Sequence, residues 1–482
     1  MKNVLLFVVV LSFGTSPAFA QNTDLPAPAP NLQTLPANSY IIAMDNTYQV
    51  NSSALFNLPA YGLVVYLLNN DIKVKWVITA GKLKDGIDFT VVSDRIKPTL
   101  NATAVSRNFK SGPFVIFSSD TTGVAALIDA FYTANGLTGS RQPFVYRNSA
   151  AVTVDVRYDL TGFKPMAAIL NDGGNRAIHL AFMSAAAIPA SNYTTITGDN
   201  LLSSCYTFAS EPHNSKTGSA VNTAISNMKV FVNNGGNLLA QCAAVPNYEN
   251  NVLGRFQTTT GITVSNTAIG TSVLFPNPDL SYTQFEGVYN GSLAGSVRNW
   301  EITDAPANSE HDHVTGTGAN TAVISASVSK MVSGKGGLVF YLGSHDYSTA
   351  DVQNINGIRM YMNAFLTPAV QVCPNMTLLA LSTLTQTIPP PTNSQPITKD
   401  KIALLTNPII STLAFHYTAV ANSVNKLSIY NASGAKVFTT NIAAQKGTNS
   451  ISLTLNRAVP AGLYLLEMAN NKERTTIKFI KQ

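Results

Sequence analysis

The sequence predicts an α/β protein with two parallel-sheet α/β domains followed by a small C-terminal β-sandwich. Through most of the chain, buried apolar runs of strand length alternate with helical stretches. After residue 400 only short alternating apolar runs remain, separated by turn residues. The chain has 482 residues, of which 45% are hydrophobic and 12% charged. This composition is typical of a globular protein, and the length is sufficient for several domains.

The first residues have the pattern of a secretory leader. Lys2 is followed by an apolar run at 4–13 and by the small-x-small triplet at 18–20. The run is shorter than the roughly 20 residues that span a bilayer, and we expect no transmembrane segment elsewhere. We therefore expect residues 1–20 to be a signal peptide that is cleaved, and residues 21–38, rich in Pro, Ala and Asn, to be a flexible lead-in.

Charge and cysteine content limit the function classes further. The formal net charge is +6, but Lys and Arg are scattered singly, so we expect no nucleic-acid partner. The three cysteines, Cys205, Cys242 and Cys373, allow at most one disulfide. At least one thiol is therefore left over in an oxidising compartment, where it must be protected or used.

The first α/β domain is expected at 39–160. Its predicted elements are strands at 40–44, 74–78 and 113–117, helices at 60–69 and 122–135, and an extended connection or edge strand at 150–158. Because strands and helices alternate in the βαβ order, we expect a parallel sheet.

The same rhythm restarts in a second α/β domain at 161–370. Its predicted elements are strands at 166–170, 237–241 and 338–342, and helices at 176–187, 219–233 and 352–365. A proline-rich stretch then predicts a linker at 371–400, because prolines exclude a helix or a central strand. The sandwich is expected at 401–482.

Several motifs near the C-terminus carry a family resemblance. They are Asn407-Pro408, the run from Leu427 to Gly434, Pro460-Ala-Gly-Leu-Tyr464, and the ending 478–481. This module resembles the C-terminal sorting domain of the type IX secretion system of Bacteroidetes, although its opening Leu-Thr-Asn-Pro departs from the Tyr-Pro-Asn-Pro of the family. The alternative is a carbohydrate-binding or generic immunoglobulin-like sandwich.

The resemblance implies a destination. In the family, the sorting domain is carried across the outer membrane by the secretion machinery and is commonly removed. The cargo is then released or attached to surface lipopolysaccharide. We therefore expect a secreted or cell-surface protein with an unknown extracellular ligand.

The strongest candidate for chemistry is Cys242. A nucleophile on a tight strand-to-helix turn needs small neighbours two residues before and after it, and Ala240 and Ala244 occupy those places. A thiol also needs a base to ionise it. His345 follows the strand at 338–342, at the carboxyl end where α/β sheets build their sites.

This arrangement resembles the class I glutamine amidotransferase-like superfamily, in which a Gly-x-Cys-x-Gly elbow precedes a His after a late strand. Here both elbow glycines are Ala, and Asp346 and Tyr347 stand in place of the Pro and Glu that follow the His. The resemblance implies Cys242 as nucleophile, His345 as base and Asp346 as a possible catalytic carboxylate. The alternative is that Cys242 is a small buried hydrophobic residue and His345 an ordinary loop residue.

The turn at Asp172, Gly173 and Gly174 follows the strand at 166–170 and precedes a helix. Its backbone amides are candidates for binding an anion or an oxyanion. The alternative is that the glycines only supply positive φ. Because the chain has no Gly-rich phosphate fingerprint, we expect no nucleotide, and we expect no other cofactor.

Two histidine motifs remain. His311 and His313, in the segment 309–313, are two residues apart and beside acidic residues, but a solvated loop is favoured over a metal site. Glu211-Pro-His213, with Cys205 nearby, is a candidate to approach the same cleft, but a surface loop held by Pro212 is favoured. No metal is therefore expected.

The sequence predicts an exported protein with an amidotransferase-like domain that binds an unknown ligand. The alternative is an active thiol hydrolase or amidase that uses a Cys-His pair. The sequence leaves open whether the protein is an enzyme.

Overall fold

The structure is a computed structural model. It describes residues 25, 29–265, 267–302, 311–320, 322–331, 336–369, 381–387, 401–409, 412–431, 436–455, 462–470 and 474–481. Within these ranges, no helix combines the length and the apolar character needed to cross a membrane. The predicted signal peptide, residues 21–24 and 26–28 of the predicted lead-in, and most of the predicted linker lie outside the described residues. Within the region predicted as a flexible lead-in, residues 32–35 form a strand of the first sheet.

The first sheet is antiparallel throughout, so the predicted parallel sheet in this region is wrong. Its spatial order is β1 (Leu32–Leu35), β8 (Val152–Asp159), β3 (Lys75–Val77), β6 (Phe114–Ile116), β2 (Tyr40–Ile42), β7 (Val145–Asn148), β4 (Ile87–Lys97) and β5 (Asn101–Lys110).

The reason lies in which strands are neighbours. Helix α1 (Pro59–Asn69) connects β2 to β3, and these two strands do run in the same direction. However, β6 lies between them and is antiparallel to both. The long β4–β5 hairpin was not predicted, and β8 lies inside the sheet, between β1 and β3. The alternation of strands and helices therefore predicted the helical connection between β2 and β3 correctly, but it did not predict which strands are neighbours in the sheet.

The second sheet has a parallel half and an antiparallel half. The parallel strands are, in order, β10 (Tyr193–Ile196), β9 (Ala167–Leu170), β11 (Phe208–Glu211), β12 (Asn237–Gln241) and β18 (Leu338–Leu342). The antiparallel strands continue from β18 as β17 (Ile324–Lys330), β15 (Asn299–Ile302) and β13 (Ile262–Ser265), with β16 (His311–Gly316) beside β17 and β14 (Val273–Leu274) beside β16.

Helices cover both faces of the second sheet. They are α3 (Ala177–Ala185) and α6 (Val352–Leu366) on one face, and α4 (Asn222–Asn233) and α5 (Ala244–Glu249) on the other. The predicted strands at 237–241 and 338–342 coincide with β12 and β18, and the predicted helix at 352–365 coincides with α6 to within one residue.

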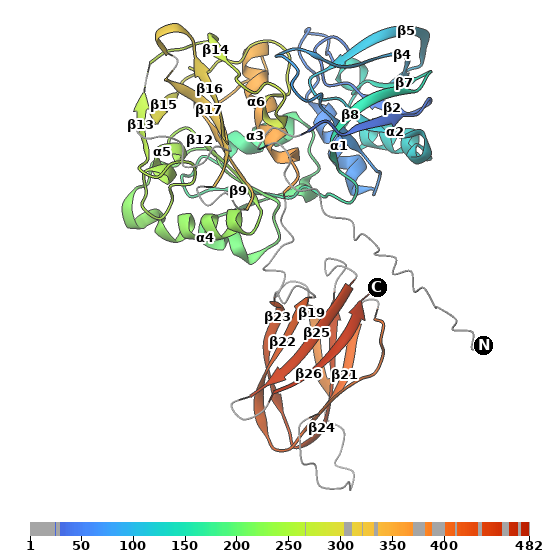
Figure 1. Ribbon diagram of the computed structural model, residues 1–482, viewed down its shortest axis with the longest axis vertical. Helices are drawn as coiled ribbons and strands as arrows, with labels where there is room; N and C mark the ends of the chain where they lie inside the picture. The colour runs from blue at the N-terminus through green and yellow to red at the C-terminus, as the bar shows by residue number, and fades with distance from the viewer. Residues whose placement is uncertain are drawn as a thin grey trace, which may run out of the picture.

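One layer of helices lies between the two sheets (Figure 1). Side chains alternate along a strand, so neighbouring residues enter different cores. Ile42 and Ile169 face the shared core, where α1, α3 and α6 pack together with α2 (Val124–Ala134). Ile41 faces a separate core on the far side of the first sheet, and Leu170 faces the core beneath α4. The shared core therefore joins the two regions predicted as separate α/β domains.

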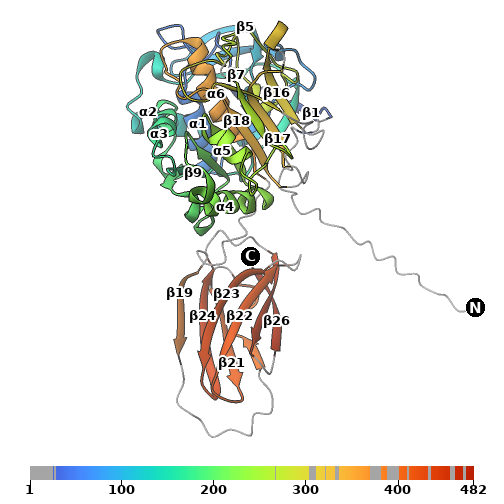
Figure 2. The same ribbon diagram turned by 90° about the vertical axis from the view of Figure 1, so that its left-hand side faces the viewer.

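The C-terminal region is a sandwich of two four-stranded antiparallel sheets (Figure 2). One sheet contains β19 (Leu381–Thr387), β24 (Gly447–Leu455), β21 (Thr412–Ala419) and β20 (Lys401–Leu404), and the other contains β23 (Lys436–Ala444), β22 (Ser423–Asn431), β25 (Gly462–Ala469) and β26 (Arg474–Lys481). Among the described side chains, its core is formed by residues between Ile402 and Phe479. Strand β19 lies inside the predicted linker. It is the edge strand of its sheet, so it pairs with β24 on one side and has no neighbouring strand of the described structure on the other.

Candidate functional site

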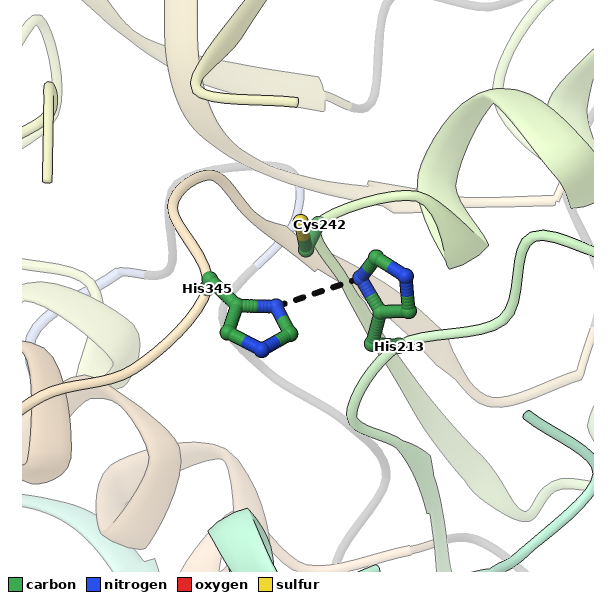
Figure 3. A group of neighbouring side chains, drawn as sticks. All are labelled: His213, Cys242 and His345. Carbon is green, nitrogen blue, oxygen red and sulfur yellow. Dashed lines mark hydrogen bonds between the residues drawn. The ribbon is translucent and has the colours of Figure 1, made fainter. Parts of the chain in front are cut away.

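Three side chains meet at the carboxyl edge of the parallel strands. His213, Cys242 and His345 come from the loops that follow β11, β12 and β18. These strands are consecutive neighbours and run parallel, so their carboxyl ends lie side by side. Figure 3 shows the three side chains converging from their separate loops. This edge is where open α/β sheets place ligand sites.

The distances between the reactive atoms are short. The Nδ1 atoms of His345 and His213 are 3.2 Å apart, and their rings are nearly perpendicular at 84°. Nitrogens of both rings and the Sγ of Cys242 all lie within 4.8 Å of one another. Because a nitrogen–nitrogen contact at this distance is a hydrogen bond, one ring donates its Nδ1–H to the other.

Cys242 occupies a strained backbone position. Its φ is +54°, in the left-handed region that side-chain-bearing residues rarely adopt. Its N–H donates to the carbonyl of Leu342 at 3.0 Å, which ties the turn to the end of β18. Ala240 and Ala244 are fully buried on either side of it. The strand-to-helix turn expected from the small neighbours is therefore present, and strain of this kind is concentrated at functional positions.

A loop covers the sulfur of Cys242, whose exposed fraction is 0%. A Cβ built on Gly295 would lie 2.5 Å from the Cβ of His345 and 3.1 Å from the Sγ of Cys242, so only glycine fits there. The φ of Gly295 is +135°. The hydroxyl of Ser296 lies 3.6 Å from the same sulfur. The N–H of His345 donates to the carbonyl of Ala294 at 2.7 Å, which holds the cover against the site.

A buried hydrogen-bond network supports the loop that carries His345. The Nε2 of Gln241 donates to the main-chain carbonyls of Ser344 and His345 at 3.3 and 3.1 Å. Its Oε1 lies 2.9 Å from the Nε2 of His179. Ser344 itself has a φ of +68°. The loop is therefore held in a strained conformation by the residue that immediately precedes Cys242.

The protonation state of His179 follows from its surroundings. Complete burial lowers the pKa of His179 to about 3, so the ring is neutral at neutral pH. Because Gln241 Oε1 can only accept, the proton lies on His179 Nε2, and Nδ1 accepts from the hydroxyl of Ser210 at 3.0 Å. Ser210 in turn lies 3.0 Å from the hydroxyl of Tyr361. The chain of donors runs from α6 to the site.

A carboxyl pair lies behind His213. Glu211 is fully buried and accepts from the hydroxyl of Tyr248 at 2.9 Å. Burial, together with the nearby carboxylate of Asp172, raises the pKa of Glu211 to about 8. Burial also raises the pKa of Asp172 and lowers that of His213, which the neighbouring His345 lowers further. Charged forms are disfavoured throughout this part of the site.

The predicted turn at Asp172, Gly173 and Gly174 lies beside His213. A Cβ on Gly173 would lie 1.7 Å from the carbonyl oxygen of His213, so close packing requires glycine there. Its N–H lies 3.4 Å from Glu211 Oε1, and the N–H of Gly174 donates to the carbonyl of Asn171 at 3.1 Å. Gly174 has a φ of +78°, as the alternative interpretation requires. Both amides already have acceptors, and a role for the turn in oxyanion binding stays a prediction.

Asp346 is exposed, and its carboxylate accepts the N–H of Tyr347 at 2.7 Å. Its side chain thus caps its own loop, and its assignment as a catalytic carboxylate stays a prediction. The third member of the cluster is His213, which sequence reasoning placed in a surface loop. The sequence offers no clear signal for it, because the preceding strand β11 has only four residues and ends in Ser210 and Glu211.

The other sequence candidates have different outcomes. Cys205 is disulfide-bonded, whereas Cys242 is a free thiol. The backbone of His311 and His313 belongs to β16, but their side chains, like the acidic residue that precedes them, lie outside the described residues.

A surface pocket of about 430 Å³ lies beside α5, the helix that follows Cys242. Pro246 and Asn247 of α5 line it, together with Asn222 at the start of α4. Asn247 also donates to the carbonyl of Asn214, the residue after His213, at 3.2 Å. The pocket therefore adjoins the loops that carry His213 and Cys242.

Comparison with known families identifies the C-terminal module. Residues 406–482 match the family described as the secretion system C-terminal sorting domain. The match confirms the predicted sorting domain of type IX secretion, so the protein is exported through the secretion machinery and is secreted or located at the cell surface. No curated protein matches the sequence at a significant level.

Proposed function

We propose that this exported protein is a thiol-dependent acyl hydrolase with Cys242 as its nucleophile. The observation that carries the proposal is the position of Cys242 at φ +54° with nitrogens of two imidazoles within 4.8 Å of the cluster's sulfur. A strained turn that presents a thiol beside a base is the arrangement that nucleophilic catalysis needs. The amidotransferase-like assignment is part of this proposal and rests on the order of Cys242 and His345 along the chain.

The chemistry follows from the three side chains. His345 takes the proton of the Cys242 thiol, and the thiolate attacks the carbonyl carbon of an amide or ester. A carbon–sulfur bond forms, the bond to the leaving group breaks, and the imidazolium returns its proton to that group. Water then hydrolyses the thioester, which releases a carboxylic acid and restores the thiol.

His213 has a distinct role in this mechanism. Its contact with the Nδ1 of His345 fixes the orientation of the ring of the base. We assign this orienting role to His213 because the side chain of Asp346 is directed to its own loop. The catalytic set is then Cys242, His345 and His213.

Substrate must displace the loop around Gly295, because the sulfur is fully covered. The adjoining pocket beside α5 is uncharged along its lining, which includes Thr217, Ser219 and Asn222. We propose that this pocket holds a neutral, hydrogen-bonding part of the substrate next to the nucleophile.

The second candidate function is a non-catalytic binding protein that keeps only the fold. The complete burial of Cys242 favours it, because structural cysteines are typically buried and inert. In this case the pocket beside α5 holds the extracellular ligand, and attachment to surface lipopolysaccharide through the sorting pathway keeps the protein at the cell.

An activated ester separates the two functions without knowledge of the natural substrate. The protein lacking residues 1–20 is mixed with p-nitrophenyl acetate, and intact and peptide masses are followed together with release of nitrophenol. We expect a burst of nitrophenol and an acetyl group on Cys242. Cys242→Ser should abolish the burst, and His345→Ala should slow it by about a hundredfold or more, as expected for the loss of a general base.

His416→Gln provides a matched control, because His416 lies in the sandwich and contacts Ser450 instead of the site. This variant should keep the full burst. Acetylation that falls only on lysines, with Cys242 unmodified in the folded protein, overturns the hydrolase proposal and supports the binding function.

A further inference from the structure

The geometry of the cluster fits the coordination of a metal ion. In a tetrahedral Zn²⁺ site, two nitrogen ligands at about 2.0–2.1 Å from the metal lie about 3.3 Å apart, and a sulfur and a nitrogen ligand lie about 3.6 Å apart. The Nδ1 atoms of His213 and His345 are 3.2 Å apart. The Sγ of Cys242 lies within 4.8 Å of the ring nitrogens. Side-chain rotations that move the sulfur by about 1 Å complete three corners of a tetrahedron.

We propose that His213, Cys242 and His345 form a binding site for a late first-row transition-metal cation, with Zn²⁺ as the best-fitting ion. The proposal goes beyond the hydrolase function and does not depend on it. Two imidazoles and a thiolate are the ligands that Zn²⁺ prefers, whereas Ca²⁺ and Mg²⁺ prefer oxygen.

The surroundings of the cluster favour ordered coordination. All three ligands follow adjacent parallel strands, which fix the positions of their backbones. The hydroxyl of Ser296, 3.6 Å from the sulfur, is placed to donate to a coordinated thiolate. Gln241 holds the carbonyl of His345 and thereby the backbone of that ligand.

Binding has a defined proton balance and a functional consequence. The thiol of Cys242 loses one proton to solvent as its sulfur becomes a ligand, and both imidazoles bind as neutral rings. Three protein ligands leave one coordination position for water or another small ligand. A sulfur that donates an electron pair to Zn²⁺ is a weaker nucleophile, so bound Zn²⁺ should slow the acylation of Cys242.

The experiment uses Zn²⁺ and Co²⁺ as probes on the protein lacking residues 1–20, after treatment with a chelator. We expect one Zn²⁺ per chain by calorimetry. Co²⁺ should give the visible bands of a tetrahedral site together with a near-ultraviolet sulfur-to-metal band. Cys242→Ser should remove the sulfur band, and His213→Ala and His345→Ala should each weaken binding at least about tenfold.

His416→Gln is the control for metal bound by histidines outside the cluster and should bind as the unaltered protein does. Circular dichroism of each variant shows whether its fold is retained. Binding that is absent, or that all three ligand variants leave unchanged, overturns the proposal. The result is independent of the hydrolase proposal, because metal binding is measured without any acyl donor and acylation is measured after the metal has been removed.

Discussion

The side-chain amide of Gln241 donates to the main-chain carbonyl of His345 at 3.1 Å. The residue before the candidate nucleophile therefore holds the loop of its candidate base. The same side chain lies 2.9 Å from the ring of His179, which joins the site to a network that reaches α6. The relative position of Cys242 and His345 is thus held by the Gln241 network as well as by the covering loop.

Replacing Gln241 by Leu should uncouple the two loops. The change removes the donor to the His345 carbonyl and leaves the N–H of His179 without its acceptor, which costs about 1–3 kcal/mol in the free energy of unfolding. Acetylation of Cys242 by p-nitrophenyl acetate should also slow by at least about tenfold, because a base displaced by about 1 Å loses its alignment.

Gln257→Leu controls for the loss of a buried amide. Gln257 is buried, donates to the carbonyl of Val339 and accepts from Ser327, but it makes no contact with the His345 loop in the described structure. We expect similar destabilisation with an unchanged acetylation rate. Equal slowing in both variants would show that Gln241 acts only through overall stability.

Gly295→Ala should move the cover away from the sulfur. Its Cβ would overlap His345 and press on Cys242, so the loop must shift outward. Alkylation of native Cys242 by iodoacetamide should then become faster, while stability falls by about 1–3 kcal/mol. In Gly318→Ala the new Cβ meets nothing within 4 Å, although φ is +59°, so only backbone strain is added. Faster alkylation in both variants would contradict a covering role for Gly295.

The neutral ring of His179 should make stability depend on pH. Burial lowers its pKa to about 3 in the folded protein, against 6.5 ordinarily. Below about pH 6.5 the unfolded chain binds a proton that the folded chain does not. The contribution of His179 is therefore complete above that pH and falls by about 1.4 kcal/mol for each pH unit below it, down to about pH 3.

Urea unfolding followed by tryptophan fluorescence measures this dependence. The two tryptophans, Trp76 and Trp300, both lie in the α/β region, so the signal reports that region and not the sandwich. In His179→Gln the fall of unfolding free energy with decreasing pH should be less steep by that amount. An unchanged pH slope in this variant would show that His179 is protonated in the folded protein.

Prediction from sequence succeeded where a local pattern determines the structure. Ala240 and Ala244 around Cys242 indicated a crowded turn, and the structure has it. The strand at 338–342 was found because it is a continuous apolar run, as expected for a strand buried on both faces. The strand at 237–241 was found from the shorter apolar run Leu238-Leu239-Ala240 after two glycines.

Prediction from sequence failed where the structure depends on pairing between strands that are far apart in the chain. Nothing in the sequence around β2 and β3 shows that β6 lies between them, because pairing depends on contacts between strands that are distant in the sequence. The placement of His213 in the cluster was considered but not favoured, for a related reason. Its strand, β11, is only four residues long and ends in Ser210 and Glu211, polar residues that resemble a loop until their burial and hydrogen bonds are known.

The rate of Cys242 alkylation by iodoacetamide in the folded, metal-free protein, compared with the rate in urea at the same neutral pH, tests the central claim most directly. Because the imidazole of His345 is proposed to take the thiol proton, we predict faster alkylation of Cys242 in the folded protein than in the unfolded chain, and a loss of this advantage in His345→Ala. A Cys242 that reacts only after unfolding would contradict the account and identify the thiol as structural.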